Sequence, residues 1–384
     1  MSLLFAPGAI GKVEIKNRLV RAPTFEGLAD ESGRVTDELV SVYRRLAEGD
    51  VGLILSGFMF VHRMGQVMRR QVGISSDDAV AGLSRLAEVV HASGGKIAFE
   101  MSHGGRQANA ALIGRRPYGP SAVHRDPTSF TKPAAMTQQD ILEVVDSFVA
   151  ATRRAVAAGG DIIYIHAAGG DLLNQFLSPY FNCRTDEWGG SMDNRFRILR
   201  TIIEGARDAV GDLPILVKMN AQDYTPEPGV TPELAREYAA RLSEMGVSAL
   251  ELSSGVKLYC FMNCWRGEVP IKEVLAALPA WKRPIGLVEG WNLDNLRAVK
   301  PAAGRMALLL VGGMRRVEHM EAVLERGEAD FICLCRPFIR QPDLVRKFKG
   351  GAKQATCRSC NKCFAAGINN LPVRCYQGGI PAIS

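Results

Sequence analysis

Long apolar runs are missing from this sequence. No stretch approaches the ~20 consecutive apolar residues that a membrane-spanning helix needs. The N-terminal segment lacks a basic start, an apolar core and a small-residue cleavage site, so it does not resemble a signal peptide. Low-complexity segments and repeats of 20–50 residues are also absent. We therefore expect a cytoplasmic protein with no membrane partner.

A concentrated basic face is missing as well. The net charge of +7 comes from 47 basic and 40 acidic residues, and the densest basic patches are only pairs such as Arg315-Arg316. Nucleic-acid binding usually needs clustered basic residues, so we expect no nucleic-acid partner. With 47% hydrophobic and 23% charged residues, the composition is that of an ordinary globular protein.

An alternation of strand and helix patterns fills most of the chain. The expected strands are 18–22, 51–55, 96–101, 161–165, 215–219, 249–252, 306–311 and 331–334, and 284–288 is an alternative for the seventh. The expected helices are 37–48, 78–92, 138–158, 192–210, 232–245, 293–300 and 317–325. Eight such units predict an α/β fold, a (β/α)8 TIM barrel. A doubly wound sheet is the alternative, but no G-x-G-x-x-G follows the first strand.

In a TIM barrel, the chemistry takes place at the carboxyl ends of the strands. Polar and glycine residues at these ends are Pro23, Thr24, Ser56, Gly57, Glu100 to Arg106, His166, Lys218, Asn220, Ser253, Ser254, Gly312, Gly313, Cys335 and Arg336. Glycines before a helix start, together with an arginine from the next loop, form a phosphate-binding cup. Gly312, Gly313 and Arg336 have this arrangement, which predicts a phosphate site.

Several motifs resemble the old yellow enzyme family of FMN-dependent NAD(P)H:flavin oxidoreductases. The longest match runs from Tyr164-Ile-His-Ala-Ala through Leu172-Leu-Asn-Gln-Phe-Leu-Ser-Pro to the segment 182–195. His103-Gly-Gly-Arg106 and the glycine pair 312–313 occur in the family order, and the resemblance covers residues 3–350. It implies an FMN-binding barrel over residues 1–350 and a separate cysteine-rich segment over 351–384.

The resemblance also implies roles for individual residues. His166 would donate a hydrogen bond to a substrate oxygen above the flavin and polarise the substrate C=C bond. Lys218 would place positive charge near the flavin N1–C2=O edge, and Glu100 would contact the pyrimidine edge. The other implied flavin contacts are Pro23, Thr24, Phe25, Gly57, Gly312, Gly313, Cys335 and Arg336.

Two positions depart from the family pattern. Gly169 stands where relatives commonly carry a second His or Asn, and Asp171 stands where they carry the Tyr that protonates the substrate. A carboxyl group with an ordinary pKa near ~4 is ionised at neutral pH and is a poor acid. Asp171 is a catalytic candidate, as a proton donor, a base or a recognition group for a cationic substrate.

Nine cysteines without a secretion signal favour thiol, metal or catalytic roles over disulfides. Cys357, Cys360, Cys363 and Cys375 resemble the ligands of the family's iron–sulfur subset, which includes 2,4-dienoyl-CoA reductase and trimethylamine dehydrogenase. Their spacing suits a [4Fe–4S] cluster, and zinc or unoccupied thiols remain alternatives. The other cysteines are interpreted as packing residues: Cys260 and Cys264 in a loop over the barrel mouth, and Cys183 and Cys333 as buried apolar groups.

The implied activity is hydride transfer from NADH or NADPH through FMN to an activated alkene, such as an α,β-unsaturated carbonyl compound or an acyl-CoA. One alternative is an amine dehydrogenase or demethylase that passes electrons out through the cluster. Another is a flavin electron-relay subunit of a larger complex. The expected partners are a small-molecule substrate and, as open alternatives, an electron-transfer subunit or further copies of this chain.

Overall fold

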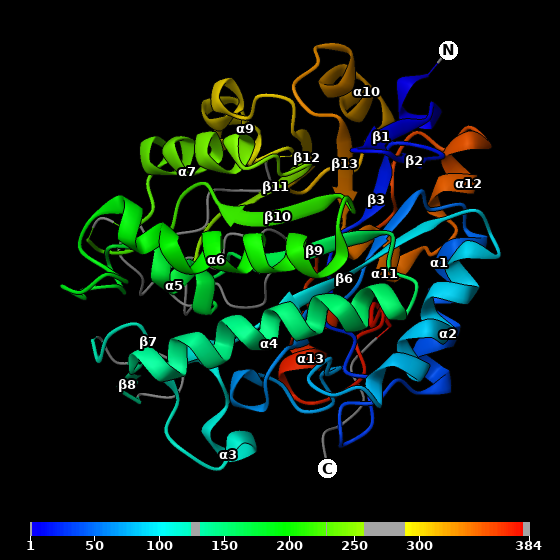
Figure 1. Ribbon diagram of the computed structural model, residues 1–384. Coiled ribbons are helices and arrows are strands. Elements are labelled where there is room, and N and C mark those ends of the chain that lie inside the picture. The colour runs from blue at the N-terminus through cyan, green and yellow to red at the C-terminus, as the bar shows by residue number, and fades with distance from the viewer. Residues whose placement is uncertain (1, 124–130, 228, 257–288, 379–384) are drawn as a thin grey trace.

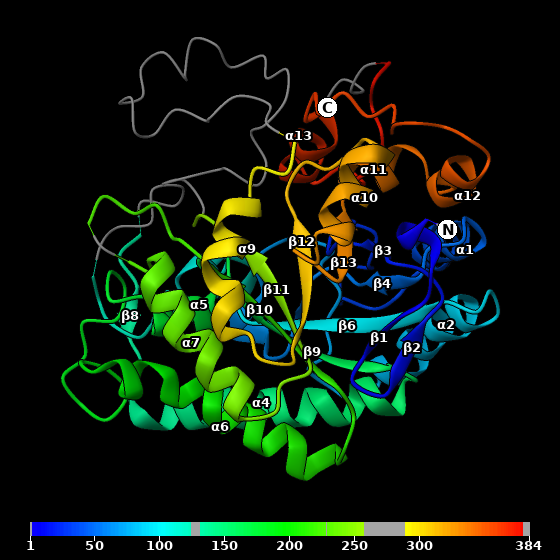
Figure 2. The same ribbon diagram turned by 90° about the horizontal axis from the view of Figure 1, so that it is seen from above.

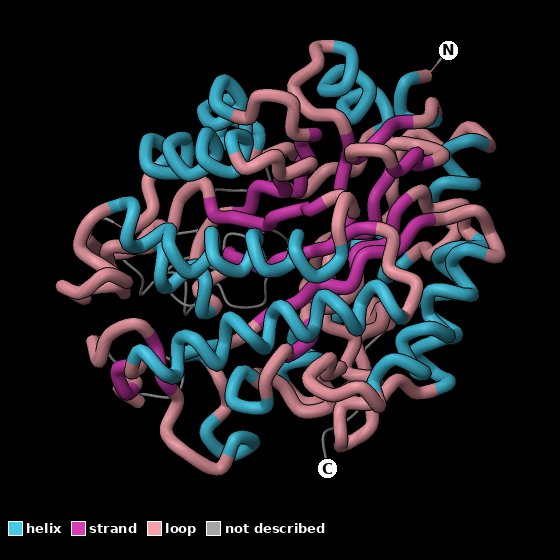
Figure 3. Tube along the Cα trace, viewed as in Figure 1, coloured by secondary structure: helices cyan, strands magenta, loops and turns pink. Residues whose placement is uncertain are grey.

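The computed structural model describes residues 2–123, 131–227, 229–256 and 289–378 (Figure 1). The alternative seventh strand at 284–288 and the predicted packing of Cys260 and Cys264 lie outside the described residues. Figure 3 shows strands gathered in the centre of the molecule and helices around them.

Eight parallel strands form a closed barrel. They are β3 (Leu19–Arg21), β4 (Leu53–Leu55), β6 (Lys96–Ser102), β9 (Ile162–Ala167), β10 (Ile215–Asn220), β11 (Ala249–Ser253), β12 (Ala307–Val311) and β13 (Phe331–Leu334). Each strand pairs with the next, and β13 pairs with β3 to close the ring. The predicted TIM barrel and all eight of its strands are therefore confirmed, with bounds shifted by at most a few residues.

In the described part of the chain, the seven predicted helices are present and cover the barrel (Figures 1 and 2). They are α1 (Asp37–Glu48), α2 (Ala79–His91), α4 (Gln138–Ala157), α6 (Met192–Val210), α7 (Pro232–Glu244), α9 (Leu293–Val299) and α10 (Val317–Glu325), and each matches a predicted helix. The start of α4 illustrates why these segments are helical. Thr137 accepts the backbone N–H of Asp140, and the Asp140 carboxylate accepts the N–H of Thr137, which satisfies two free donors at the helix start.

Shorter elements were not predicted. The helices α3 (Ala110–Ile113), α5 (Leu172–Leu177), α11 (Arg336–Arg340), α12 (Leu344–Lys349) and α13 (Lys362–Ile368) lie in loops or after the barrel. Short strands are β1 (Gly8–Ile10), β2 (Val13–Ile15), β5 (Met59–Phe60), β7 (Tyr118–Gly119) and β8 (Ala134–Ala135), and 3-10 turns are η1 (Leu3–Phe5), η2 (Arg63–Gly65), η3 (Gly105–Gln107) and η5 (Lys300–Ala302). They have few residues, so hydrophobic periodicity cannot reveal them.

The two ends of the barrel differ in polarity. At the amino end, Ile10 and Ile15 of the β1–β2 hairpin pack against the apolar side chains inside the barrel, including Val20 and Leu53. Toward the carboxyl end the interior holds charged side chains from β6, β9, β10 and β11, which are described below. The amino end is therefore a packed core, and the polar groups face the opposite mouth.

The segment after residue 350 packs against the barrel. The backbone N–H of Val317 donates to the carbonyl of Lys353 at 2.9 Å, and that of Val373 donates to the carbonyl of Glu26 at 2.8 Å. The C-terminal segment thus reaches the loop that follows β3, and a domain boundary at residue 350 stays a prediction. None of the helices in the described part of the chain combines the length and apolar character needed to cross a bilayer.

Candidate active site

Three predicted residues meet because their strands are neighbours. Glu100 on β6, His166 on β9 and Lys218 on β10 come from strands that pair in the order β6–β9–β10, and Lys218 is the register partner of His166. The His166 Nδ1 atom lies 2.9 Å from Glu100 Oε1, and the Lys218 Nζ atom lies 3.4 Å from the same oxygen. Glu100 is 1% exposed. The barrel therefore brings one carboxylate and two basic groups together, although Glu100 and Lys218 are 118 residues apart in the chain.

His166 lies between two carboxylates. Its Nε2 atom is 3.2 Å from Oδ2 of Asp171, while Nδ1 faces Glu100. Burial opposes the charged imidazolium, but the two acids outweigh it and raise the pKa of His166 to about 9. His166 is therefore a buried cation at neutral pH, with a proton on each ring nitrogen.

Asp171 lies at the start of α5, five residues after His166. Besides His166, its Oδ2 accepts a hydrogen bond from the Ser102 hydroxyl at 3.0 Å. The nearby Gly169 has φ +66°, and a Cβ at this position would have only His166 Nε2 within 4 Å, at 3.9 Å. Gly169 therefore leaves open space beside His166.

A second carboxylate approaches Lys218 from β11. Glu251 is the register partner of Lys218, and its Oε1 lies 3.7 Å from the lysine Nζ, while Oε2 accepts a short hydrogen bond from the Tyr164 hydroxyl. Burial lowers the pKa of Lys218, but Glu100 and Glu251 more than compensate and raise it above its ordinary value. For Glu100, burial is opposed by Lys218 and His166, which hold its pKa below the ordinary value.

The sequence interpretation missed Glu251 and Tyr164. Both are fully buried and lie in the middle of apolar strands, Glu251 within Ala-Leu-Glu-Leu-Ser and Tyr164 within Ile-Ile-Tyr-Ile-His. An acid inside an otherwise apolar strand was the available signal, because acidic residues are almost never fully buried without a partner.

The predicted residues after β3 and β4 lie together. The Thr24 hydroxyl donates to the carbonyl of Ala22 at 3.1 Å and lies 3.1 Å from Cys335 Sγ, which joins the loop after β3 to the loop after β13. A Cβ on Gly57 would come within 2.5 Å of the Thr24 carbonyl oxygen, so these two loops touch. Phe25 packs against Phe58, with ring centroids 6.0 Å apart. Pro23 follows Ala22 in the same loop.

The glycine pair after β12 has the conformation of a close-approach loop. Gly313 has φ +75°, in the left-handed region that favours glycine. A Cβ on Gly312 would lie 3.0 Å from Asn292 Cβ and 3.1 Å from its backbone nitrogen. The left-handed φ of Gly313 and the close approach of Asn292 to Gly312 therefore both favour glycine at these positions.

The loop of η3 forms one wall near Asp171. Gln107 donates to the carbonyl of Gly169 at 3.1 Å, and the buried Arg106 guanidinium lies over the Phe181 ring at 4.8 Å. His103 is buried beside Tyr118, with stacked rings whose centroids are 5.6 Å apart. Burial lowers the pKa of His103 to about 3, so this histidine is a neutral structural group.

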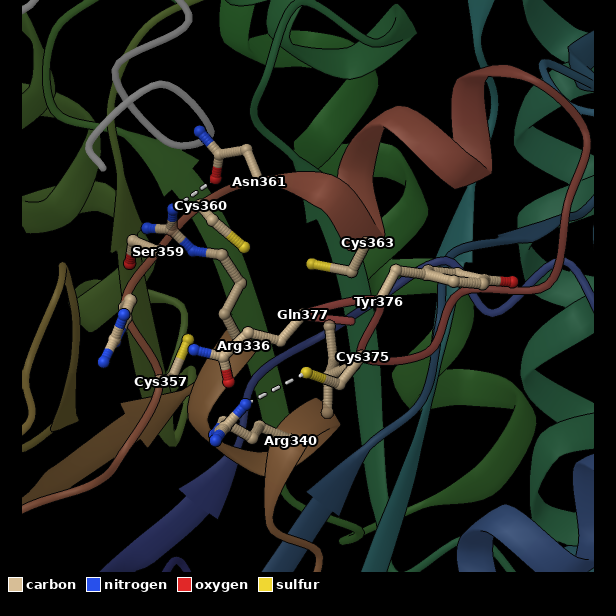
Figure 4. Close-up of a pocket in the computed structure, with 12 residues that line it drawn as sticks. Arg336, Arg340, Cys357, Ser359, Cys360, Asn361, Cys363, Cys375, Tyr376 and Gln377 are labelled. Atoms are coloured by element: carbon tan, nitrogen blue, oxygen red, sulfur yellow. Dashed lines mark hydrogen bonds between the residues drawn. The ribbon is translucent and has the colours of Figure 1, made fainter. Parts of the chain in front are cut away.

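The four C-terminal cysteines line one small cavity that is open to solvent. In Figure 4 the sulfur atoms of Cys360 and Cys363 point toward each other, and those of Cys357 and Cys375 face the same space. Arg336 also lines this cavity, and its Nη1 donates to Asn361 Oδ1 at 2.6 Å. The arginine predicted for the phosphate cup therefore also contacts the cysteine segment.

Within the described ranges, no three His, Cys, Asp or Glu side chains are close enough to hold one metal ion.

The two cysteines predicted to be buried apolar groups, Cys333 and Cys183, differ in their exposure. Cys333 is buried, as expected, but Cys183 is exposed, so its prediction as a buried apolar group was wrong. Cys183 follows α5 in a surface turn where its N–H donates to Ser121, and the turn leaves its thiol in solvent.

The family model for the NADH:flavin oxidoreductase / NADH oxidase family matches residues 3–355. The chain belongs to this family. The resemblance inferred from the sequence motifs is thereby confirmed.

Some curated relatives of this flavin oxidoreductase family are about as long as this chain, and others are nearly twice as long. An NADH oxidase of Thermoanaerobacter brockii is 34% identical over 97% of this chain and 55% of the relative. An NADPH dehydrogenase of a Geobacillus species is 36% identical over 89% of this chain and 92% of the relative. The chain thus spans about half the length of the first curated relatives that it matches.

A solved complex of 2-naphthoyl-CoA reductase with 2-naphthoyl-CoA has the same fold. It is 26% identical to this chain, with a TM-score of 0.86, and the similarity covers 97% of this chain and 56% of the solved chain. With 97% of the 384 residues covered, only about 12 residues lie outside the match. The match therefore extends past residue 350 into the cysteine segment.

Proposed function

We propose that this protein is an FMN-dependent NAD(P)H oxidoreductase that reduces an activated C=C bond. The observation that carries the proposal is the group Glu100–His166–Lys218 at the carboxyl ends of β6, β9 and β10. In this group an imidazole with a raised pKa and the Lys218 ammonium both lie against the Glu100 carboxylate, which supports a role for His166 as proton donor. The family to which the chain belongs supports the flavin and the NAD(P)H donor.

The residues present fit FMN. Lys218 offers a positive charge to the N1–C2=O edge, and Glu100 offers an acceptor to the N3–H group. The glycine pair at 312–313 would offer backbone N–H groups to the phosphate, since Gly313 has φ +75° in the left-handed region. Pro23, Thr24, Phe25, Gly57, Cys335 and Arg336 would complete the flavin contacts from the neighbouring loops.

When bound, FMN supplies the hydride-transfer chemistry between NAD(P)H and the substrate. The chain itself supplies charge and protons. His166 holds a proton on Nε2 that faces both Asp171 and the open space beside Gly169. A substrate oxygen in this space would accept that hydrogen bond, which draws electrons from the C=C bond toward the oxygen.

In our proposal Asp171 orients His166 and keeps it protonated, so that His166 replaces the missing phenol as the acid. Its Oδ2 is fixed by Ser102 as well as by the imidazolium. We place acyl-CoA esters among the acceptors because the structurally similar 2-naphthoyl-CoA reductase binds an acyl-CoA. α,β-Unsaturated carbonyl compounds have the same acceptor group.

We also propose that Cys357, Cys360, Cys363 and Cys375 hold a [4Fe–4S] cluster. All four line one cavity, with three on a short segment and the fourth further along the chain. A single zinc ion is the weaker candidate, because Zn–S bonds of about 2.3 Å would draw all four sulfurs into one tight group. With such a cluster, an amine dehydrogenase is the second candidate function, since the Asp171 carboxylate suits a cationic amine.

The experiment begins with anaerobically purified protein. Flavin is identified by its absorption spectrum after release, and iron and acid-labile sulfide are quantified. The protein is then mixed with NADH or NADPH and an enone or enoyl-CoA, and separately with amines and an electron acceptor.

The ene-reductase proposal predicts bleaching of the flavin by NAD(P)H and reoxidation by the alkene. Bleaching by amines, with none by NAD(P)H, would favour the dehydrogenase. Protein that folds but takes up no FMN from an excess would contradict both.

A further inference from the structure

Glu251 is a buried acid that the proposed chemistry does not use. It lies in the middle of β11, is 0% exposed, and points into the barrel with Tyr164 and Lys218 as its neighbours. Its Oε1 atom has no hydrogen-bond partner among the described residues. The nearest cationic atom recorded for it is Lys218 Nζ, 3.7 Å away, which is beyond hydrogen-bond length.

Packing alone does not explain this side chain. Removing a carboxylate from water is costly, and an apolar side chain of similar volume at such a site is often neutral or stabilising. Neighbouring interior positions carry apolar residues, such as Leu216, Ala249 and Leu309. A role for the charge of Glu251 therefore has to come from what it does to Lys218.

The charged groups around Glu251 come from several strands. Lys218 from β10 and His166 from β9 are the cations, Glu100 from β6 is the other facing acid, and Tyr164 donates its hydroxyl. Cys333 from β13 is the remaining titratable neighbour. Burial and the charge of Glu100 raise the pKa of Glu251 above its ordinary value, although Lys218, the Tyr164 hydrogen bond and His166 act in the opposite direction. The ammonium of Lys218 is thus shared between Glu100 and Glu251.

We propose that Glu251 is a positioning residue that holds the Lys218 ammonium together with Glu100 and, by sharing its charge, lowers the reduction potential of the bound flavin. The inference rests on the proposed function, in which Lys218 faces the flavin. Reduced flavin is anionic, so a negative group behind Lys218 weakens the stabilisation that the ammonium gives to it.

The test is the midpoint potential of the FMN-loaded protein, measured spectroscopically against a reference dye. Glu251→Gln keeps the shape of the side chain and removes its charge. We expect the equilibrium constant for flavin reduction to rise at least tenfold, which is about 30 mV for a two-electron couple. Glu251→Asp keeps the charge and should restore most of the wild-type potential.

The matched control is Asp223→Asn. Asp223 is also a fully buried acid, but its partners are the amides of Asn220 and Asn174 and the backbone N–H of Val230. Its substitution should leave the flavin potential unchanged. A shift equal to that of Glu251→Gln would mean that any buried acid has this effect, and it would overturn the specific role of Glu251.

A second variant covers the case in which Glu251→Gln does not fold. Tyr164→Phe removes the hydroxyl that hydrogen-bonds to the Glu251 carboxylate, which favours the protonated acid, and it should raise the potential in the same direction by a smaller amount. An unchanged potential in folded, FMN-loaded Glu251→Gln, or in Tyr164→Phe if the first variant fails, refutes the inference. Failure of the wild-type protein to bind FMN refutes the proposed function instead, so the two failures are distinguishable.

Discussion

The Nε2 atom of His166 lies 3.2 Å from Oδ2 of Asp171. Burial lowers the pKa of His166, but Glu100 and this contact with Asp171 outweigh burial and raise the pKa to about 9. The consequences can be measured one at a time.

Asp171→Asn should lower the pKa of His166, because one of the two neighbouring negative charges is removed. The alkaline limb of the kcat/KM profile, which in wild type should fall near pH about 9, is then expected at lower pH. The measurement is the pH dependence of enone or enoyl-CoA reduction between pH 6 and 10. Unchanged profiles in the variant would show that His166 is not the group that sets this limb.

Asp171→Tyr should restore the family's phenolic proton donor. General acids contribute roughly 10²- to 10⁴-fold to rates, and because His166 already serves as an acid we expect a gain of about tenfold in kcat for simple enones. Ser102→Ala, which removes the other hydrogen bond to Asp171, is the control that disturbs the loop without adding an acid. Equal rates in all three proteins would place the proton donor elsewhere.

The free energy of unfolding should depend on pH through His166. Its pKa is raised from an ordinary value near 6.5 to about 9, so its stabilising contribution is complete below pH 6.5 and is lost as the pH rises through 9. This rise in pKa corresponds to about 3 kcal/mol at most. Denaturant unfolding at pH 6.5 and pH 9.5 measures the loss, and His166→Gln should show less of it. The same loss in that variant would assign the effect to other groups.

Gly312→Ala should weaken FMN binding at the phosphate end. The added methyl would lie 3.0 Å from Asn292 Cβ, so the loop must shift to accept it. We expect at least a tenfold rise in the Kd of FMN, measured by fluorescence quenching on refilling the apoprotein. Gly350→Ala is the control, because its Cβ would meet nothing closer than the Arg346 carbonyl oxygen at 3.3 Å.

Serine at any one of Cys357, Cys360, Cys363 or Cys375 should reduce bound iron and sulfide and the visible absorption of the cluster. Cys183→Ser is the matched control, because this thiol is exposed and does not line the cavity. Bound zinc in wild type, with no sulfide, would contradict the iron–sulfur proposal while leaving the flavin site intact.

Much of the barrel could be predicted because each strand is a short apolar run followed by an amphipathic helix. The position of His166 at a strand end followed from the same pattern, and so did the placement of Glu100 and Lys218 at the same end of the barrel. The contact between Arg336 and Asn361 could not be predicted, because it joins two loops whose relative position depends on how the C-terminal segment packs.

The acid at Glu251 within an apolar strand signalled a buried charge, but its partners were beyond sequence reasoning. Its neighbours Tyr164 and Lys218 are 87 and 33 residues away in the chain, and only strand register brings the three together. The exposure of Cys183 was predicted wrongly, because a single small thiol outside a periodic segment does not show whether its position is buried or in a surface turn.

The pairing of β13 with β3 joins the last barrel strand to the first, and the N–H of Ala22 donates to the carbonyl of Leu334. During synthesis from the N-terminus, the loop containing Thr24 therefore lacks its neighbour until Leu334 has left the ribosome. With the flavin site proposed above, a ribosome stalled before β13 would therefore display a chain whose Thr24 loop is not yet completed for FMN binding.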